Sequence, residues 1–254
     1  MSEHYLEFRD VSISFEDHAV LKNVSFFVDR GETAVILGRS GVGKSVSLKL
    51  LLGFLQPDAG RIIVAGQDVT GWSEEQFSHI RRRVTMVFQS GALFDSLTVA
   101  ENVAFALEGR EGHTRDAIGK RVNELLEMLD VAQFADRLPS DLSTGMKRAV
   151  AIARALAEDP DAILYDEPTT MVDPLMASYM GDLILKLKNK FKKTSIVVTH
   201  DTHLARKLAD RVIFLVDGRA AFFGAWSELE SSKDPFLHNF LQQDELIPAL
   251  DASA

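Results

Sequence analysis

The sequence predicts an α/β fold in which a block of helices interrupts a mixed sheet. A short apolar run at residues 33–37 leads into a glycine-rich loop at 38–45, and an apolar stretch at 46–52 follows. Strand, loop and helix in this order are typical of α/β proteins. Between residues 92 and 131 the apolar spacing becomes helical, which predicts an insert. Three more runs end in polar turns, as antiparallel strands do, at residues 6–15, 24–28 and 61–65.

The glycine-rich loop matches the phosphate-loop pattern G-x-x-x-x-G-K-[ST] at every fixed position. Its glycines let backbone N–H groups approach phosphate oxygens, and the following helix adds the positive end of its dipole. Lys44 would bring its charge to the β- and γ-phosphates, and Ser45 its hydroxyl to Mg²⁺. A packing role for the glycines alone would explain neither residue. The loop therefore predicts a nucleoside triphosphate site made by Gly38, Arg39, Ser40, Gly41, Val42, Gly43, Lys44 and Ser45.

The composition narrows the class of protein. The chain has 254 residues, no cysteine and a formal net charge of −9. Without cysteine it has neither disulfides nor thiolate metal sites, and its negative charge argues against broad nucleic-acid binding. It contains no apolar run of the ~18–20 residues that cross a bilayer, and its first residues do not resemble a signal peptide. We therefore expect a cytosolic protein, or one docked to a partner from the cytosolic side.

A pair of carboxylates follows a second buried strand, predicted at residues 162–167. The strand ends in Asp166 and Glu167, and ionised side chains in such a place are costly without a partner. Mg²⁺ beside bound phosphates would be that partner for Asp166, while Glu167 would position or deprotonate the attacking water. A hydrogen-bonded pair of acids at the end of a strand is the alternative.

Three further residues each allow a functional and a structural interpretation. Residues 194–201 form a predicted strand that brings His200 to the carboxyl edge of the sheet, where ligands collect in α/β folds; a core histidine is the alternative. The ring of Phe15 would either stack on an adenine or fill the core. Ser143 precedes a helix of small residues and is predicted to cap it, a role that needs no ligand.

Taken together, residues 5–225 resemble the nucleotide-binding ATPase subunits of ABC transporters. The resemblance rests on features in a fixed order: the phosphate loop, Gln89, the signature at 142–146, the Asp166-Glu167 strand, Asp173 and His200. It implies a phosphate-loop (RecA-like) ATPase core with a mixed sheet, plus an inserted helical subdomain. The expected parts of this single domain (1–254) are an ATP-binding core at 1–88 and 159–225, a helical subdomain at 89–158 and a C-terminal tail at 226–254.

The resemblance also implies roles for single residues. Ser45, Gln89 and Asp166 would hold Mg²⁺, and Gln89 would couple the site to a transmembrane partner. Ser143 and Gly145 would cap the γ-phosphate of ATP bound by a second copy of the chain, in a dimer that encloses two ATP molecules. Asp173 would link the two sites of that dimer. Lys44, Glu167 and His200 would be the catalytic residues, with His200 on the γ-phosphate, and Phe15 would take the adenine-stacking place.

The chain departs from the family pattern at its signature, which is usually Leu-Ser-Gly-Gly-Gln. Thr144 and Met146 replace one of the two glycines and the glutamine, and Met171-Val172 replaces the commoner Gly-Leu before Asp173. Thr144 adds a Cβ near a place where backbone approaches phosphate. Since Ser143 and Gly145 are kept, these changes imply tuned hydrolysis at most and not its loss.

Two stretches resemble the ATPases of Mla/Mce-type lipid transporters, namely residues 88–105 and the tail segment 234–241. This resemblance implies a complex at the cytoplasmic face of the bacterial inner membrane that moves phospholipid between membranes. Its partners would be an integral-membrane permease and an Mce-type lipid-binding protein, and no nucleic acid. In the tail, Phe236, Phe240 and Leu241 would either contact the dimer mate or fold back on their own domain. The alternative functions are transport of a small polar solute, or the action of a soluble ABC protein on ribosomes or DNA.

Overall fold

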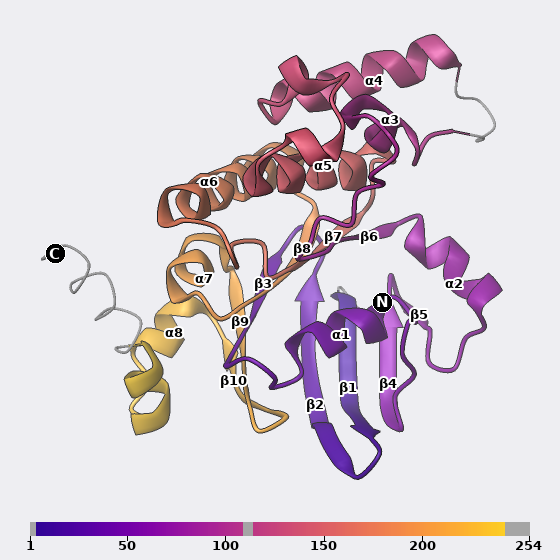
Figure 1. The fold of residues 1–254 in the computed structure, drawn as a ribbon. Helices are drawn as coiled ribbons and strands as arrows, with labels where there is room; N and C mark the ends of the chain where they lie inside the picture. Colours follow the sequence, from indigo (N-terminus) through magenta and orange to yellow (C-terminus); the bar gives the residue numbers. More distant parts are fainter. Residues whose placement is uncertain (1–3, 109–113, 242–254) are drawn as a thin grey trace, which may run out of the picture. The chain divides into compact units, whose positions relative to one another are not determined.

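The computed structural model describes residues 4–108 and 114–241 (Figure 1). The chain divides into two compact units, the first formed by Met1–Trp72 with Ile196–Ala254 and the second by Ser73–Ser195. The predicted division into core, helical subdomain and tail remains a prediction.

An antiparallel sheet in the order β2-β1-β4-β5 lies in the first unit. Phe8 of β1 and Phe26 of β2 are directly paired, and their rings stack with centroids 4.6 Å apart. The strands predicted at 6–15, 24–28 and 61–65 are confirmed, although β2 begins earlier, because residues 18–21 continue the pairing with β1. The strands are β1 (His4–Phe15), β2 (His18–Asp29), β4 (Ala59–Val64) and β5 (Gln67–Asp68).

The first unit also holds strands of a second sheet, in the order β10-β9-β3-β8. All residues of β3 are buried, as expected of a strand covered on both faces. β3 runs parallel to β9, whereas β9 runs antiparallel to β10, so this is a mixed sheet, as predicted. The elements are β3 (Thr33–Leu37), α1 (Lys44–Leu51), the end of β8 (Thr194–Thr199), α7 (Thr202–Leu208), β9 (Arg211–Val216), β10 (Arg219–Gly224) and α8 (Trp226–Glu230).

The second unit pairs β6 with β7 in parallel and carries the predicted helices. α3, α4 and α5 lie together in Figure 1 and contact one another. The apolar faces predicted from the helical spacing are buried, including Val99, Val103, Val122 and Leu125. The predicted polar break at 109–112 lies outside the described residues. The elements are α2 (Glu74–Arg81), β6 (Val84–Val87), α3 (Val99–Ala104), α4 (Arg115–Met128), η1 (Ala132–Phe134), η2 (Pro139–Asp141), α5 (Thr144–Ala157), β7 (Ala162–Asp166) and α6 (Pro174–Phe191).

The described part of the C-terminal tail packs on the first unit. Residues 235–241 are helical, and the rings of Phe236 and Phe240 lie against Phe214 of β9 with centroids 6.2 and 4.7 Å apart. Leu237 is buried beside them. Of the two interpretations of the tail, folding back on its own domain is therefore seen in this chain up to residue 241.

Across residues 4–108 and 114–241, no helix combines the length and the apolar character that crossing a membrane requires.

Candidate functional site

The phosphate loop leads from β3 into α1, in the order that the motif requires. Gly43 caps α1 in the left-handed conformation and, as a glycine, has no side chain that could cap the helix. The N–H groups of such a turn, with the helix dipole behind them, form a natural binding site for an anion. Lys44 is only 5% exposed, and its Nζ donates to the carbonyl oxygens of Gly38 (2.8 Å) and Arg39 (3.1 Å).

Two glycines of the loop are required by space as well as by conformation. A Cβ on Gly38 would lie 2.6 Å from the carbonyl oxygen of Leu215, and one on Gly43 would lie 2.7 Å from a methyl group of Leu21. Both distances are too short for a real side chain. Gly41, by contrast, faces open space but has φ +81°, which favours glycine.

A cavity of ≈ 700 Å³ lies beside the phosphate loop within the first unit. This volume falls in the range of pockets that bind small molecules. Phe15 is 42% exposed at the end of β1, where it pairs with His18 of the cavity wall. An exposed ring is available for stacking, whereas the core interpretation of Phe15 is wrong. The wall is formed by His18, Ala19, Val20, Lys22, Arg39, Ser40, Gly41, Val42, Phe214, Leu215, Val216, Asp217, Gly218 and Phe236.

The turn between β9 and β10 belongs to this cavity and was not predicted from the sequence. The carbonyl oxygen of Gly218 accepts from the N–H of Lys22 at 2.8 Å, and a Cβ on Gly218 would overlap the backbone of Val20. The turn therefore fixes the start of β2 beside the phosphate loop. Asp217-Gly218 between two apolar runs is a strong hairpin signal, and it could have identified the turn from sequence.

His200 follows directly after β8, as predicted, and its side chain is exposed. The interpretation of His200 as a core histidine is therefore wrong. Its neighbours fix the backbone on both sides: Thr199 accepts from the N–H of Asp201 at 3.0 Å, and Asp201 caps α7 by accepting from Leu204 at 3.0 Å. His200 therefore extends into solvent from a strand end whose backbone is fixed.

Asp166 and Glu167 stand at the end of β7 in the second unit. Asp166 is the last residue of the strand, and Glu167 lies just outside it with φ +46°. Both are nearly buried, at 9% and 8% exposed. The hydroxyl of Thr170 donates to Oε2 of Glu167 at 3.0 Å, so the carboxylate is held in one orientation. A left-handed conformation is unusual for a residue other than glycine and often marks a functional position.

Arg148 connects this carboxylate loop to α5 and was not predicted as a site residue. Its two terminal amino groups donate to the carbonyl oxygens of Pro168 and Thr170. Burial lowers the pKa of its guanidinium. The residues are some twenty positions apart in sequence and carry no common motif, so no local pattern indicated the contact.

The predicted signature residues lie at the N-terminus of α5. Ser143 is its N-cap and accepts from the N–H of Met146 at 3.3 Å, which confirms the predicted cap. Thr144 is exposed in the first turn, whereas Gly145 is buried beneath the thioether of Met176. Asp173 caps α6 by accepting from the N–H of Met176 at 2.9 Å. The signature and the start of α6 are therefore in contact within one chain.

Gln89 lies exposed in a turn closed by the bond from the N–H of Gly91 to the carbonyl oxygen of Phe88, at 2.9 Å. Arg154 of α5 donates to the carbonyl oxygens of Gly91 (3.1 Å) and Ala92 (2.9 Å), which holds the turn on the helix. Burial lowers the pKa of the Arg154 guanidinium. The turn is therefore fixed in the second unit by a side chain that the sequence did not single out.

The loop that follows is organised by Asn102, which is fully buried. Its Nδ2 donates to the carbonyl oxygens of Phe94, Leu97 and Thr98 at 3.0–3.1 Å, and its Oδ1 accepts from the N–H of Phe94 at 2.8 Å. Phe94 and Phe105 are about half exposed, and the centroids of their rings lie 4.5 Å apart. The result is a rigid loop that presents two aromatic rings to solvent.

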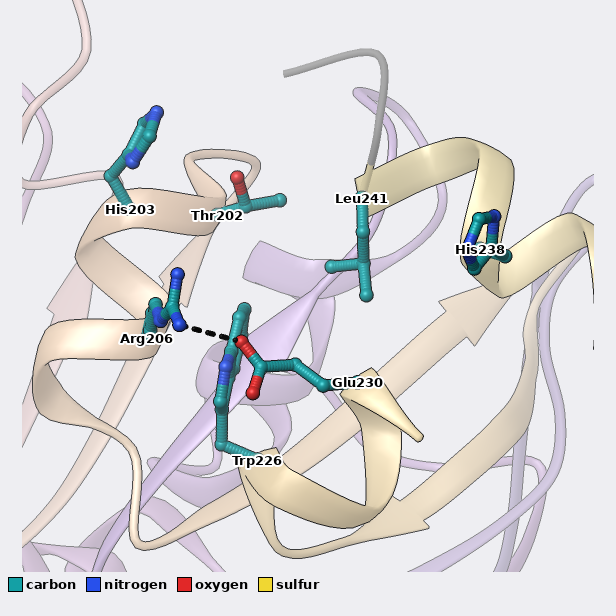
Figure 2. Close-up of a pocket in the computed structure, with 7 residues that line it drawn as sticks. All are labelled: Thr202, His203, Arg206, Trp226, Glu230, His238 and Leu241. Atoms are coloured by element: carbon teal, nitrogen blue, oxygen red, sulfur yellow. Dashed lines mark ion pairs between the residues drawn. The ribbon is translucent and has the colours of Figure 1, made fainter. Parts of the chain in front are cut away.

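A smaller cavity of ≈ 270 Å³ lies elsewhere in the first unit (Figure 2). Arg206 of α7 and Glu230 of α8 form an ion pair across it at 3.2 Å, and Trp226 borders it. None of the predicted nucleotide-site residues lines it. Its wall is made by Thr202, His203, Arg206, Trp226, Glu230, His238 and Leu241.

Comparison with protein families supports the interpretation of these motifs. The family model described as ABC transporter matches residues 21–170, which include the phosphate loop, the signature and the carboxylate pair. The chain belongs to the ABC transporter ATPase family. It is accordingly an ATP-hydrolysing subunit, and the predicted family is confirmed.

The relatives of this ABC ATPase differ in what they transport. It is 35% identical to the intermembrane phospholipid transport system ATP-binding protein MlaF of Haemophilus influenzae, over 95% of this chain and 92% of the relative. It is 36% identical to the sulfate/thiosulfate import ATP-binding protein CysA of Synechococcus elongatus, over 96% of this chain and 69% of the relative.

A solved dimeric structure of an ATP-binding cassette in a post-hydrolysis state, bound to ADP and Pi, has a TM-score of 0.78 and 32% identity to this ABC ATPase. The match covers 87% of this chain and 98% of that one. The predicted fold class is therefore confirmed.

The donors proposed for Mg²⁺ fit an ion that arrives with the nucleotide. Within the described residues, no group of three or more histidine, cysteine, aspartate or glutamate side chains could hold a metal by itself. Mg²⁺ commonly takes one or two carboxylates and completes its shell with phosphate oxygens and water. Asp166 and Gln89 of the second unit offer a carboxylate and an amide oxygen, and Ser45 of the first unit offers a hydroxyl. Donors of these types suit this mode of binding, and the site itself remains a prediction.

Proposed function

We propose that this ABC ATPase powers phospholipid trafficking between bacterial membranes, through a separate permease and an Mce-type lipid-binding protein. The match to MlaF carries the proposal, because it extends over nearly the whole of both chains. The match to the sulfate importer has similar identity but covers only 69% of that relative.

The phosphate loop binds the phosphates of ATP in this proposal. The N-terminus of α1, which begins at Lys44 after Gly43, and the buried ammonium of Lys44 supply positive potential at one place. The cavity walled by His18 and the loop takes the adenosine, with the exposed ring of Phe15 available to stack on the base. Mg²⁺, held by Ser45, Gln89 and Asp166, neutralises charge on the phosphates when it is bound.

A second copy of the chain completes each site. Ser143 and Gly145 stand at the N-terminus of α5, a helix long enough for its dipole to favour an anion. They contact the γ-phosphate of ATP held by the other copy, and Asp173 links the two sites. The dimeric relative with ADP and Pi supports this assembly. The exposed Met171 and Leu175, 84% and 82% accessible beside Asp173, would be covered in the dimer.

Glu167 is the general base for hydrolysis. Its carboxylate is oriented by Thr170, and a base held in one orientation takes a proton from water more readily than a mobile one. His200 leaves the end of β8 toward solvent and contacts the γ-phosphate.

The rigid loop at 94–98 receives a helix of the permease. The exposed pair of Phe94 and Phe105 provides the apolar contact, and the turn of Gln89 lies on the same segment of chain. In this arrangement the ATPase is a peripheral protein on the cytoplasmic face of the inner membrane.

The experiment is reconstitution of the ATPase with its permease and an Mce-type lipid-binding protein. We expect phospholipid to co-purify with the complete complex and to move between labelled vesicles only with ATP. The Lys44→Ala complex is the control and should transfer no lipid. ATP-driven accumulation of sulfate or another small solute, without lipid transfer, would establish the alternative that the CysA relative supports.

A further inference from the structure

We propose that Arg148 is a positioning residue that ties the signature helix to the loop of Glu167, and thereby links the two ATP sites of the dimer. The inference rests on the proposed function, because it assumes that Glu167 and the signature serve different ATP molecules. It names a residue that none of the motifs includes.

The contact runs from α5 to the carboxylate in two steps. Arg148 donates to the carbonyl oxygens of Pro168 and Thr170, which follow Glu167 in the chain. The hydroxyl of Thr170 donates in turn to Oε2 of Glu167. The backbone N–H of Thr170 also donates to the carbonyl oxygen of Glu167, with N and O 3.3 Å apart. A movement of α5 that displaces Arg148 would therefore also move Thr170, whose hydroxyl orients the carboxylate of Glu167.

The environment of Arg148 is costly, which argues against a role in packing alone. The side chain is 3% exposed, and within the described residues its Nε has no hydrogen-bond partner. No ion pair between Arg148 and a carboxylate occurs in the described parts of the chain. A buried charge that is satisfied only by carbonyl oxygens is usually less favourable than an apolar side chain of similar size. A guanidinium can, however, bridge two carbonyl groups at once with fixed geometry, as a lysine cannot.

The segment that Arg148 holds is strained and would otherwise relax. Glu167 has φ +46° and Met171 has φ +62°, so left-handed residues stand on both sides of the carbonyl groups that Arg148 binds. Such conformations persist only where the surroundings impose them. The two bonds from Arg148 fall between them and supply that constraint.

A second contact joins the same two elements. The thioether of Met176 lies over Gly145, so closely that a side chain at 145 would overlap it. The N–H of Met176 is bound by the carboxylate of Asp173. The segment from Glu167 to Met176 is therefore attached to α5 near both ends, by Arg148 and by Met176.

This arrangement has a consequence for a dimer with two ATP molecules. Glu167 would act on the ATP held by its own phosphate loop, whereas Ser143 and Gly145 would act on the ATP of the second copy. When the signature binds the ATP of the second copy, a movement of α5 would be transmitted through Arg148 to the loop that follows Glu167. Binding of ATP at one site would then orient Glu167 at the other site, so that the two sites act cooperatively.

The test uses the complete complex with its permease and compares Arg148→Met and Arg148→Lys with the wild type. For Arg148→Met we expect kcat for ATP to fall on the order of 10- to 100-fold, because a misplaced base loses rate steeply. The KM for ATP should change less than about threefold, since the phosphate loop is intact. The Hill coefficient for ATP should fall toward 1. Arg148→Lys keeps the charge and should recover part of kcat.

Arg121→Met is the matched control. Arg121 also donates to a backbone carbonyl of α5, that of Leu156 at 3.0 Å, but it lies on α4 and contacts no predicted site residue among the described contacts. Its kcat and Hill coefficient should equal those of the wild type. Thermal unfolding of each complex shows whether it is folded. If Arg148→Met does not fold, the kcat and Hill coefficient of Arg148→Lys are compared with those of the wild type instead.

Two results would overturn the inference. A wild-type kcat in folded Arg148→Met would show that Arg148 does not position the base, and a lower kcat with an unchanged Hill coefficient would show that it does not link the sites. Failure of the proposed function would look different. In that case, the wild-type complex itself would transfer no lipid, while the effect of Arg148 on hydrolysis could still be measured.

Discussion

The ammonium Nζ of Lys44 lies 2.8 Å from the carbonyl oxygen of Gly38, so the last and first parts of the phosphate loop are joined by a hydrogen bond. A second bond reaches the carbonyl oxygen of Arg39 at 3.1 Å. The side chain is held inside the loop with its charge beside the first turn of α1. The lysine therefore has two tasks, to close the loop and to attract phosphate.

Substitution of Lys44 by alanine should remove both contributions at once. We expect ATP hydrolysis to fall roughly 100- to 1,000-fold, as when a fixed donor to a reacting oxyanion is lost. ATP binding and hydrolysis by the purified chain would be measured together. Lys49→Ala, on the exposed face of the same helix, is the control and should behave as the wild type.

Glu167→Gln should separate binding from hydrolysis. Glutamine keeps the size of the side chain and can still accept from the Thr170 hydroxyl, but it cannot take a proton from water. Loss of a general base lowers the rate by about 100- to 10,000-fold. We therefore expect the variant to retain ATP and to accumulate as a closed dimer, visible by size-exclusion chromatography with ATP. Hydrolysis at the wild-type rate within the complex would show that another group is the base.

The parts of the site that could be predicted are those encoded in a few consecutive residues. The phosphate loop, the Ser143 cap and the strand ending in Asp166 are local, and each appears where the sequence placed it. Arg148, Arg154 and Asn102 could not be found in this way. Each donates to backbone carbonyl groups that any residue could provide, so their partners leave no trace in the sequence.

The same reasoning explains the two interpretations that proved wrong. Burial of Phe15 or His200 depends on what covers the end of a strand and not on the strand itself. The sequence around each residue is compatible with a strand end that is covered by other residues or exposed. In the structure, both residues are exposed.

Asn102 offers a test of the permease-facing loop. Its side chain makes four hydrogen bonds to the backbone of residues 94–98 and is fully buried. In Asn102→Leu, these backbone groups lose their partner, and we expect the free energy of unfolding to fall by about 2–6 kcal/mol, since each of the four bonds contributes ~0.5–1.5 kcal/mol.

We also expect stimulation of the Asn102→Leu ATPase by the permease to fall more than its hydrolysis alone. Denaturant unfolding and hydrolysis with and without permease would measure the two effects. Asn123→Ala, exposed on α4, should change stability by less than ~0.5 kcal/mol. Full stimulation of a destabilised Asn102→Leu would mean that the permease binds elsewhere.

Gly218→Ala should weaken the wall of the adenosine cavity through the backbone alone. Gly218 has φ +78°, and a Cβ there would overlap the carbonyl group of Val20, so alanine must strain the turn or push β2 away from the phosphate loop. A left-handed residue other than glycine costs on the order of 1–3 kcal/mol. We expect a loss of stability of at least this size.

The affinity of Gly218→Ala for ATP should fall as well, because Val20 and Gly41 share the cavity wall. Gly119→Ala is the matched control: Gly119 lies within α4, and a Cβ there meets no atom within 4 Å. Alanine at that position should stabilise the chain by about 0.5–1 kcal/mol, since glycine is the poorer helix former. Opposite signs for the two substitutions, by thermal unfolding with and without ATP, would separate the geometry of the turn from a general intolerance of alanine.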